Sequence, residues 1–167
     1  MRVVDYSKIE KRVRSQVIRR YMQAQGYTRA VCFSCGNAYR ALLAEGVDVV
    51  GVAPGGELQA LRWFKPAEVA RTFPGLFDAT SGHLPLELMY EIAGELRKEV
   101  VLERGVEYRV AAGSGETALC LKLAWPEADI AAVFDDSKPE TEWNDCNHLN
   151  ALLRIVFPGK LYRVGEG

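Results

Sequence analysis

Short apolar runs alternate with longer helical patterns along most of the chain, and this alternation constrains the fold more than any other feature. The apolar runs predict buried strands at residues 29–34, 47–54, 106–112, 128–136 and 160–164. The helical patterns fall at residues 7–25, 38–46, 56–64, 85–100, 116–125 and 149–157, whereas residues 65–83 are less regular. Such alternation favours an α/β fold. We expect an open, mostly parallel sheet of about five strands with helices on both faces, a Rossmann-like three-layer sandwich.

Length and composition predict one soluble unit. The chain has 167 residues, of which 49% are hydrophobic and 26% charged, so we expect a single α/β domain over residues 1–167. The sequence contains no apolar run of the roughly 20 residues that a membrane-spanning helix needs, and its first residues are charged. These features predict a cytoplasmic protein without a membrane partner.

Charge is distributed unevenly although the net charge is only -1. Residues 1–29 contain eight Lys or Arg against two acids, and residues 127–150 contain seven acids against Lys138. The basic residues are not interleaved with aromatic ones, which disfavours a nucleic-acid partner and favours solvated faces. The same asymmetry can steer an anionic ligand towards the chain or pair a basic surface with an acidic one. A homodimer is therefore an alternative.

In parallel α/β sheets, ligands bind where the turns after the strands converge. The turn Gly113-Ser114-Gly115-Glu116-Thr117 is the best phosphate candidate, because glycines let the backbone approach an anion and a helix follows. With Ala118 it fits G-x-G-x-x-A, and Asp135 ends the next predicted strand 22 residues after Gly113. This pattern is typical of a site for NAD or another nucleotide. Alternatively, the glycines only permit a tight turn and close helix packing.

The cysteines suggest dithiol or zinc chemistry only weakly. Cys32 and Cys35 have C-x-x-C spacing at a strand end, but three positions apart in a strand they face opposite sides. A zinc site needs about four ligands, and Cys120, Cys146 and His148 supply no second C-x-x-C. We therefore expect no metal site, with Cys32 and Cys120 acting as small core residues.

Several short motifs together resemble the pyridoxal-phosphate enzymes of fold type II, the family of tryptophan synthase β, cysteine synthase and serine/threonine dehydratases. Ser34-Cys35-Gly36-Asn37 matches the S-x-G-N turn of that family, and the GSGET turn looks like its phosphate-binding turn. The family has its Schiff-base lysine upstream of S-x-G-N, in an S-x-K context near a helix start, and YSKIEKRV places Lys8 near that point. The resemblance covers roughly residues 7–134, in a chain much shorter than members of the family.

The resemblance implies a small lyase- or transferase-like enzyme that uses pyridoxal phosphate on an amino acid or amine adduct. Lys8 would form the Schiff base with the cofactor, and Asn37 would bind the ring hydroxyl. Ser34, Cys35 and Gly36 would contact the substrate, and residues Gly113, Ser114, Gly115, Glu116 and Thr117 would hold the phosphate. Lys8 also lies in a strongly basic helix, where a solvated surface lysine is an equal alternative. A non-catalytic module that binds a small phosphorylated ligand or a partner protein remains a further alternative.

Overall fold

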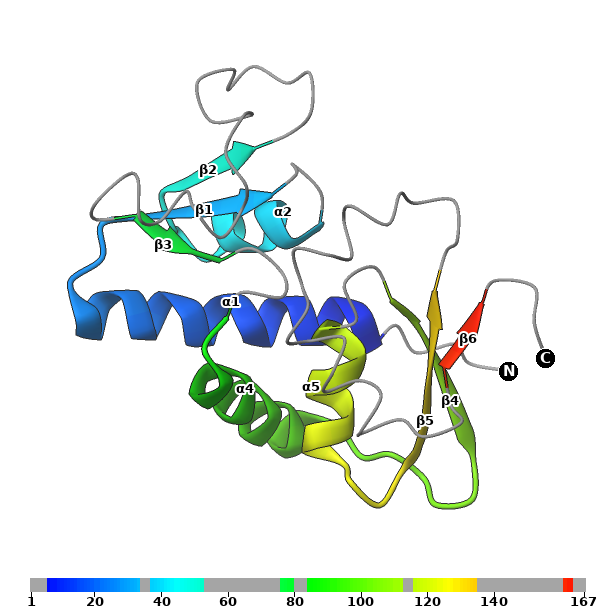
Figure 1. Cartoon of the computed structure of the whole chain (residues 1–167). Coiled ribbons are helices and arrows are strands. Elements are labelled where there is room, and N and C mark those ends of the chain that lie inside the picture. The colour runs from blue at the N-terminus through cyan, green and yellow to red at the C-terminus, as the bar shows by residue number, and fades with distance from the viewer. Residues whose placement is uncertain are drawn as a thin grey trace. The chain divides into compact units, whose positions relative to one another are not determined.

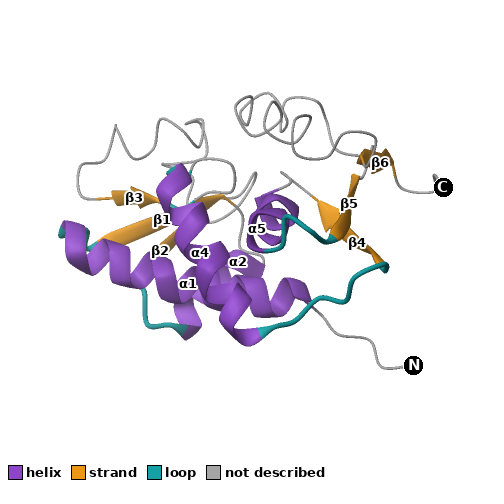
Figure 2. Ribbon diagram, turned by 90° about the horizontal axis from the view of Figure 1, so that it is seen from below, coloured by secondary structure: helices purple, strands orange, loops and turns teal. Residues whose placement is uncertain are grey.

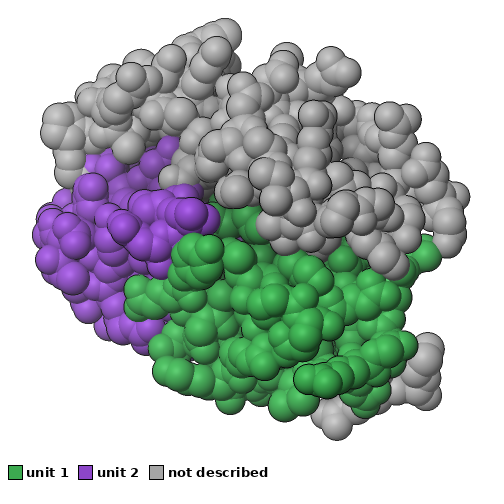
Figure 3. Space-filling view, turned by 60° about the horizontal axis from the view of Figure 1, so that its bottom comes forward, with its two compact units in different colours: residues 1–10, 89–167 green, residues 11–88 purple. Residues whose placement is uncertain are grey.

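The alternation of strands and helices persists in the computed structural model of the chain (Figure 1). The structure describes residues 6–33, 37–52, 76–79, 84–112, 116–134 and 161–163. Contacts between residues group the chain into two compact units, residues 11–88 and residues 1–10 with 89–167 (Figure 3). Within the described ranges, the strands form two separate parallel sheets of three strands each.

The unit of residues 11–88 contains the sheet β2-β1-β3, with β1 (Arg29–Phe33) in the centre. Both neighbours, β2 (Val49–Val52) and β3 (Leu76–Asp78), run parallel to β1. The helix α2 (Asn37–Ala44) connects β1 to β2 and packs against β2. Gly46, with φ of 76°, follows this helix in the left-handed conformation that commonly ends helices.

The long helix α1 (Tyr6–Gln25) precedes this sheet and buries a stripe of apolar residues. Val13, Val17, Ile18 and Met22 are at most 5% exposed. Tyr21, near the end of the helix, has its ring centroid 5.3 Å from that of Phe77 in β3, and Tyr27 lies at the same distance from Phe77. Aromatic packing therefore fastens the last turns of α1 to β3.

The second unit contains the sheet β4-β5-β6, in which β5 (Asp129–Phe134) is central. β4 (Glu107–Ala112) and β6 (Leu161–Arg163) both pair with it in parallel. The helix α5 (Glu116–Ala124) connects β4 to β5 and packs against both strands (Figures 1 and 2). Because a helix connects two parallel neighbouring strands, β4-α5-β5 is a complete βαβ unit.

Two basic side chains donate hydrogen bonds to backbone carbonyl groups, one at the end of α5 and one after it. Arg97, from α4 (Leu86–Glu99), donates a 2.7 Å hydrogen bond to the carbonyl of Ala124 and forms an ion pair of the same length with Glu127. Lys122 donates to the carbonyl of Ala128 over 2.6 Å. Carbonyl groups at a helix C-terminus lack helical partners and carry partial negative charge, so the bond from Arg97 to Ala124 stabilises the end of α5.

The α/β class predicted from the sequence is confirmed, and so is the parallel pairing of its strands. A single sheet of about five strands is not confirmed, because the described strands divide between two sheets. The irregular stretch 65–83 contains the short strand β3, which sequence analysis missed. The helices expected at 56–64 and 149–157 lie outside the described residues.

Candidate functional site

The junction between β4 and α5 follows the order of strand, turn and helix that the glycine motif predicts. β4 ends at Ala112 and α5 begins at Glu116, so residues 113–115 make the whole connection. Ala112 pairs with Phe134 in the parallel register of β4 and β5. Gly113 and Asp135 each come directly after one member of this pair, although both lie outside the described residues. The glycine turn and Asp135 thus follow adjacent strand ends in one unit.

The first turn of α5 is buried and carries an acid. Glu116 is 1% exposed and Thr117 9% exposed. Thr117 donates its hydroxyl hydrogen to Oε2 of Glu10, with 3.2 Å between the oxygens, and Glu10 is itself fully buried. The first N–H groups of a helix have no partners within the helix and form a positive end. Two buried carboxyl groups therefore belong to the neighbourhood of this helix start.

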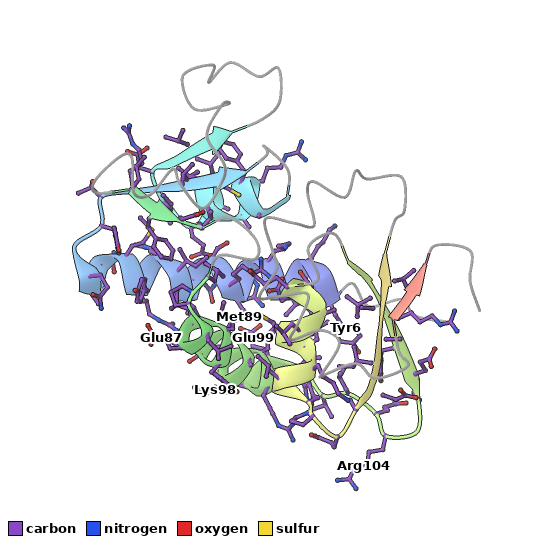
Figure 4. The ribbon with its side chains drawn as sticks, in the orientation of Figure 1. Tyr6, Glu87, Met89, Lys98, Glu99 and Arg104 are labelled. Carbon is purple, nitrogen blue, oxygen red and sulfur yellow. The ribbon has the colours of Figure 1, made fainter. Side chains whose placement is uncertain are left out.

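The start of α1 is attached to the same unit by a second contact. The ring of Tyr6, which Figure 4 labels, meets that of Tyr108 in β4 edge to face, with 5.9 Å between the ring centroids. Burial raises the pKa of Tyr6, and the charges of Tyr108 and Glu103 raise it further. The Tyr108 hydroxyl accepts a 2.9 Å hydrogen bond from the N–H of Glu103. Tyr6 and Glu10, four residues apart, share the face of α1 that meets β4 and α5.

Lys8 belongs to this unit as well, but it is exposed and lies on another face of α1. At 3.6 residues per turn, its side chain starts about 160° around the helix from that of Glu10. A Schiff-base lysine needs a site shielded from water to keep its amine deprotonated. The placement of Lys8 therefore favours the alternative of a solvated surface lysine over the role that the resemblance implies.

The other candidate turn lies in the unit of residues 11–88. β1 ends at Phe33 and α2 begins at Asn37, so Ser34, Cys35 and Gly36 connect strand to helix, as the S-x-G-N motif predicts. These three residues lie outside the described ones. The candidate residues thus divide between the two units, with Lys8 and the GSGET turn in one and Ser34–Asn37 in the other.

Two cysteines can be assigned. Cys32 in β1 and Cys120 in α5 are buried, at 3% and 0% exposure, and form no disulfide. Both therefore lie where core residues are expected. Among the described residues, no group of three or more His, Cys, Asp or Glu side chains is arranged to hold a metal ion.

The residues around α5 fit the phosphate of a ligand better than they fit the rest of pyridoxal phosphate. Glycine-containing turns that lead into a helix can bind an anion through backbone N–H groups, and residues 113–115 have that composition and that place in the chain order. Glu116 and Glu10 place two buried carboxyl groups in and next to the first turn of α5. Of the described lysines of this unit, Lys8 and Lys98 are exposed, and the part-buried Lys122 donates a hydrogen bond from its amine to the carbonyl of Ala128.

Sequence analysis missed Glu10. Its signal is nevertheless readable, because it is the only acid between residues 6 and 25, a segment with six Lys or Arg. It also falls three and seven positions before Val13 and Val17, on the buried stripe of α1. An acid at such a position is expected to be buried with a hydrogen-bond partner. The partner on α5 could not be read from the sequence.

Comparisons with protein-family models, with curated proteins and with solved structures give no match to this chain. None of the helices in the described part of the chain is sufficiently long and apolar to span a membrane.

Proposed function

We propose that this chain binds a small phosphorylated ligand at the turn between β4 and α5. The observation that carries the proposal is the parallel pairing of Ala112 with Phe134 at the strand ends that precede Gly113 and Asp135. In parallel α/β sheets this edge is where phosphates and ribose groups are bound. The backbone N–H groups of residues 113–115 would hold the phosphate, with the positive end of α5 behind them.

A nucleotide is the ligand that this arrangement supports best. In dinucleotide-binding folds, an acid at the end of the strand next to the glycine turn accepts hydrogen bonds from the ribose hydroxyl groups. Asp135 has that place in the chain order, directly after β5. The proposed activity is therefore binding of a nucleoside phosphate, in which Asp135 accepts hydrogen bonds from the ribose and the glycine turn binds the phosphate.

Pyridoxal phosphate is the second candidate, because the resemblance to fold-type-II enzymes uses the same turn for the cofactor phosphate. It adds one requirement, a covalent bond between the cofactor and Lys8. The cofactor would supply the electron sink for amino-acid chemistry, whereas the chain would supply only the phosphate site and the amine. The exposure of Lys8 makes this the weaker candidate.

Calorimetric titration of the purified chain with AMP, ATP, NAD and pyridoxal phosphate tests the proposal. Ser114→Asp adds a negative charge to the turn and should weaken binding of any phosphorylated ligand about tenfold or more. Ser114→Asn has a similar shape without the charge and is the matched control. Equal affinities of the two variants, or no binding by the wild-type chain, would reject the site.

Two further variants identify the ligand. Asp135→Asn should weaken binding of AMP while leaving inorganic phosphate unaffected, because it alters only the group proposed to contact ribose. Borohydride reduction in the presence of pyridoxal phosphate, followed by mass spectrometry, should leave Lys8 unmodified if the nucleotide assignment holds. A stoichiometric adduct on Lys8, absent from Lys8→Arg, would instead establish the pyridoxal-phosphate candidate.

A further inference from the structure

The first two turns of α1 contact both elements that flank the candidate phosphate turn. Tyr6 packs edge to face on Tyr108, the second residue of β4, and Glu10 accepts a hydrogen bond from Thr117, the second residue of α5. All four residues belong to the same unit of the chain or to the part of α1 grouped with it. Tyr6 and Glu10 are separated by about 6 Å of axial rise. This short piece of α1 therefore connects the strand before the turn to the helix after it.

The contact at Glu10 is directional. Both Glu10 and Thr117 are buried, with 3.2 Å between the bonded oxygens. Burying a carboxyl group costs free energy, and an apolar side chain of similar size often stabilises a fold as well or better. A hydrogen bond, however, has a preferred distance and angle, which apolar packing lacks. A buried acid at this position is therefore suited to orienting the first turn of α5.

The strand side of the junction is fixed in a different way. β4 pairs with β5 along its whole length, from Glu107 with Asp129 to Ala112 with Phe134. The helix side has the side-chain contact of Thr117 with Glu10 in its first turn. A phosphate bound by N–H groups between a strand end and a helix start needs both sides in one arrangement. The contact at Glu10 bears on the helix side of that requirement.

We propose that Tyr6 and Glu10, the α1 clamp, hold the first turn of α5 in the arrangement that binds the phosphate and thereby set the affinity of the site. This inference rests on the proposed function. Both are positioning residues, because the phosphate is assigned to the backbone of residues 113–115 and not to α1. A binding segment that is held in its bound arrangement loses less conformational freedom when the ligand binds, which raises affinity.

Calorimetric titration of Glu10 variants with AMP tests the clamp. Glu10→Leu should weaken AMP binding about fivefold or more, the lower end of the coupling expected between linked contacts. Glu10→Gln keeps an oxygen that can accept the hydrogen bond from Thr117, so its affinity should stay within about twofold of the wild type. Leu96→Ala removes a buried contact elsewhere in the same unit and should lower stability without this loss of affinity.

A double variant separates positioning from direct contact with the ligand. In the Glu10→Leu background, Thr117→Val should weaken AMP binding no further, because the hydrogen bond is already absent. A hydroxyl group that bound the phosphate itself would give the same loss in both backgrounds.

The other half of the clamp is tested at Tyr6, which also serves if Glu10→Leu does not fold. Tyr6→Leu removes the ring contact with Tyr108 and should weaken AMP binding severalfold. Tyr90→Leu makes the same substitution at an exposed position of the same unit and is the matched control.

Four results would overturn the clamp. They are equal AMP affinities of the wild type and Glu10→Leu; equal losses in Glu10→Gln and Glu10→Leu; additive losses from Glu10→Leu and Thr117→Val; and equal affinities of Tyr6→Leu and Tyr90→Leu. Each of these leaves the phosphate site in place, provided that the wild-type chain binds AMP and Ser114→Asp weakens that binding. Absence of AMP binding by the wild-type chain would overturn the site and the clamp together.

Discussion

The hydroxyl of Thr117 donates a hydrogen bond to the carboxyl group of Glu10, although 107 positions separate the two residues in the sequence. Both side chains are buried. A hydrogen bond to a carboxyl group in such surroundings is stronger than one at the surface, and its loss leaves a buried acceptor without that donor. The contact therefore fastens the start of α1 to the helix that follows the candidate phosphate turn.

Thr117→Val should lower the free energy of unfolding by about 1–3 kcal/mol, because it keeps the shape of the side chain but removes the donor. Urea unfolding followed by circular dichroism measures the change. In a Glu10→Leu background, the same substitution should cost clearly less, which gives a coupling energy between the two residues. Identical costs in both backgrounds would show that the hydrogen bond contributes nothing to stability.

The two faces of α4 should respond differently to truncation. Leu96 is 1% exposed, so Leu96→Ala should destabilise the chain by about 2–5 kcal/mol through lost burial and a cavity. Tyr90, on the same helix, is 58% exposed, and Tyr90→Ala should change stability by about 0.5 kcal/mol or less. Thermal unfolding of both variants checks this. Comparable losses would mean that the buried stripe of α4 is assigned to the wrong face.

Protonation of Glu127 should contribute to the loss of folding stability at acidic pH. A hydrogen bond from its own backbone N–H lowers the pKa of Glu127 below the usual 4.5, and the hydrogen bond from Arg97 lowers it further. Since the folded pKa lies below the unfolded one, this group stabilises the fold above pH 4.5, and the contribution is lost as pH falls through the folded value.

Side-chain NMR titration of Glu127 measures that pKa directly. Arg97→Gln should raise it part of the way towards 4.5, because the backbone hydrogen bond, the larger cause, remains. Arg104→Gln should raise it less, since Arg104 acts only through its charge. A larger shift in the Arg104 variant than in the Arg97 variant would contradict this order of causes.

Local patterns predicted most of the described elements. Val13 and Val17 mark the buried stripe of α1, and Gly26 and Gly46 take the positive φ values expected after helices. The division into two sheets could not be predicted, because periodicity shows that a strand is buried and not which strand it pairs with. β3 was missed since three residues, Leu76–Asp78, are too few for a periodic pattern.

The candidate site was predictable only in its order along the chain. The glycines after β4 and the acid after β5 could be read from the sequence, and the register of Ala112 with Phe134 agrees with that order. The burial of Glu10 and its bond to Thr117 depend on contacts between distant segments, which no local pattern contains.

The most direct test of the phosphate site is the response of individual backbone amides to ligand. In a ¹⁵N-labelled chain titrated with AMP, the N–H signals of Gly113, Ser114, Gly115 and Glu116 should shift together and saturate with one affinity. Those of Asn37 and its neighbours in the other unit should not follow that curve. Saturable shifts confined to residues away from the β4–α5 junction, or no saturable shift at all, would contradict the account.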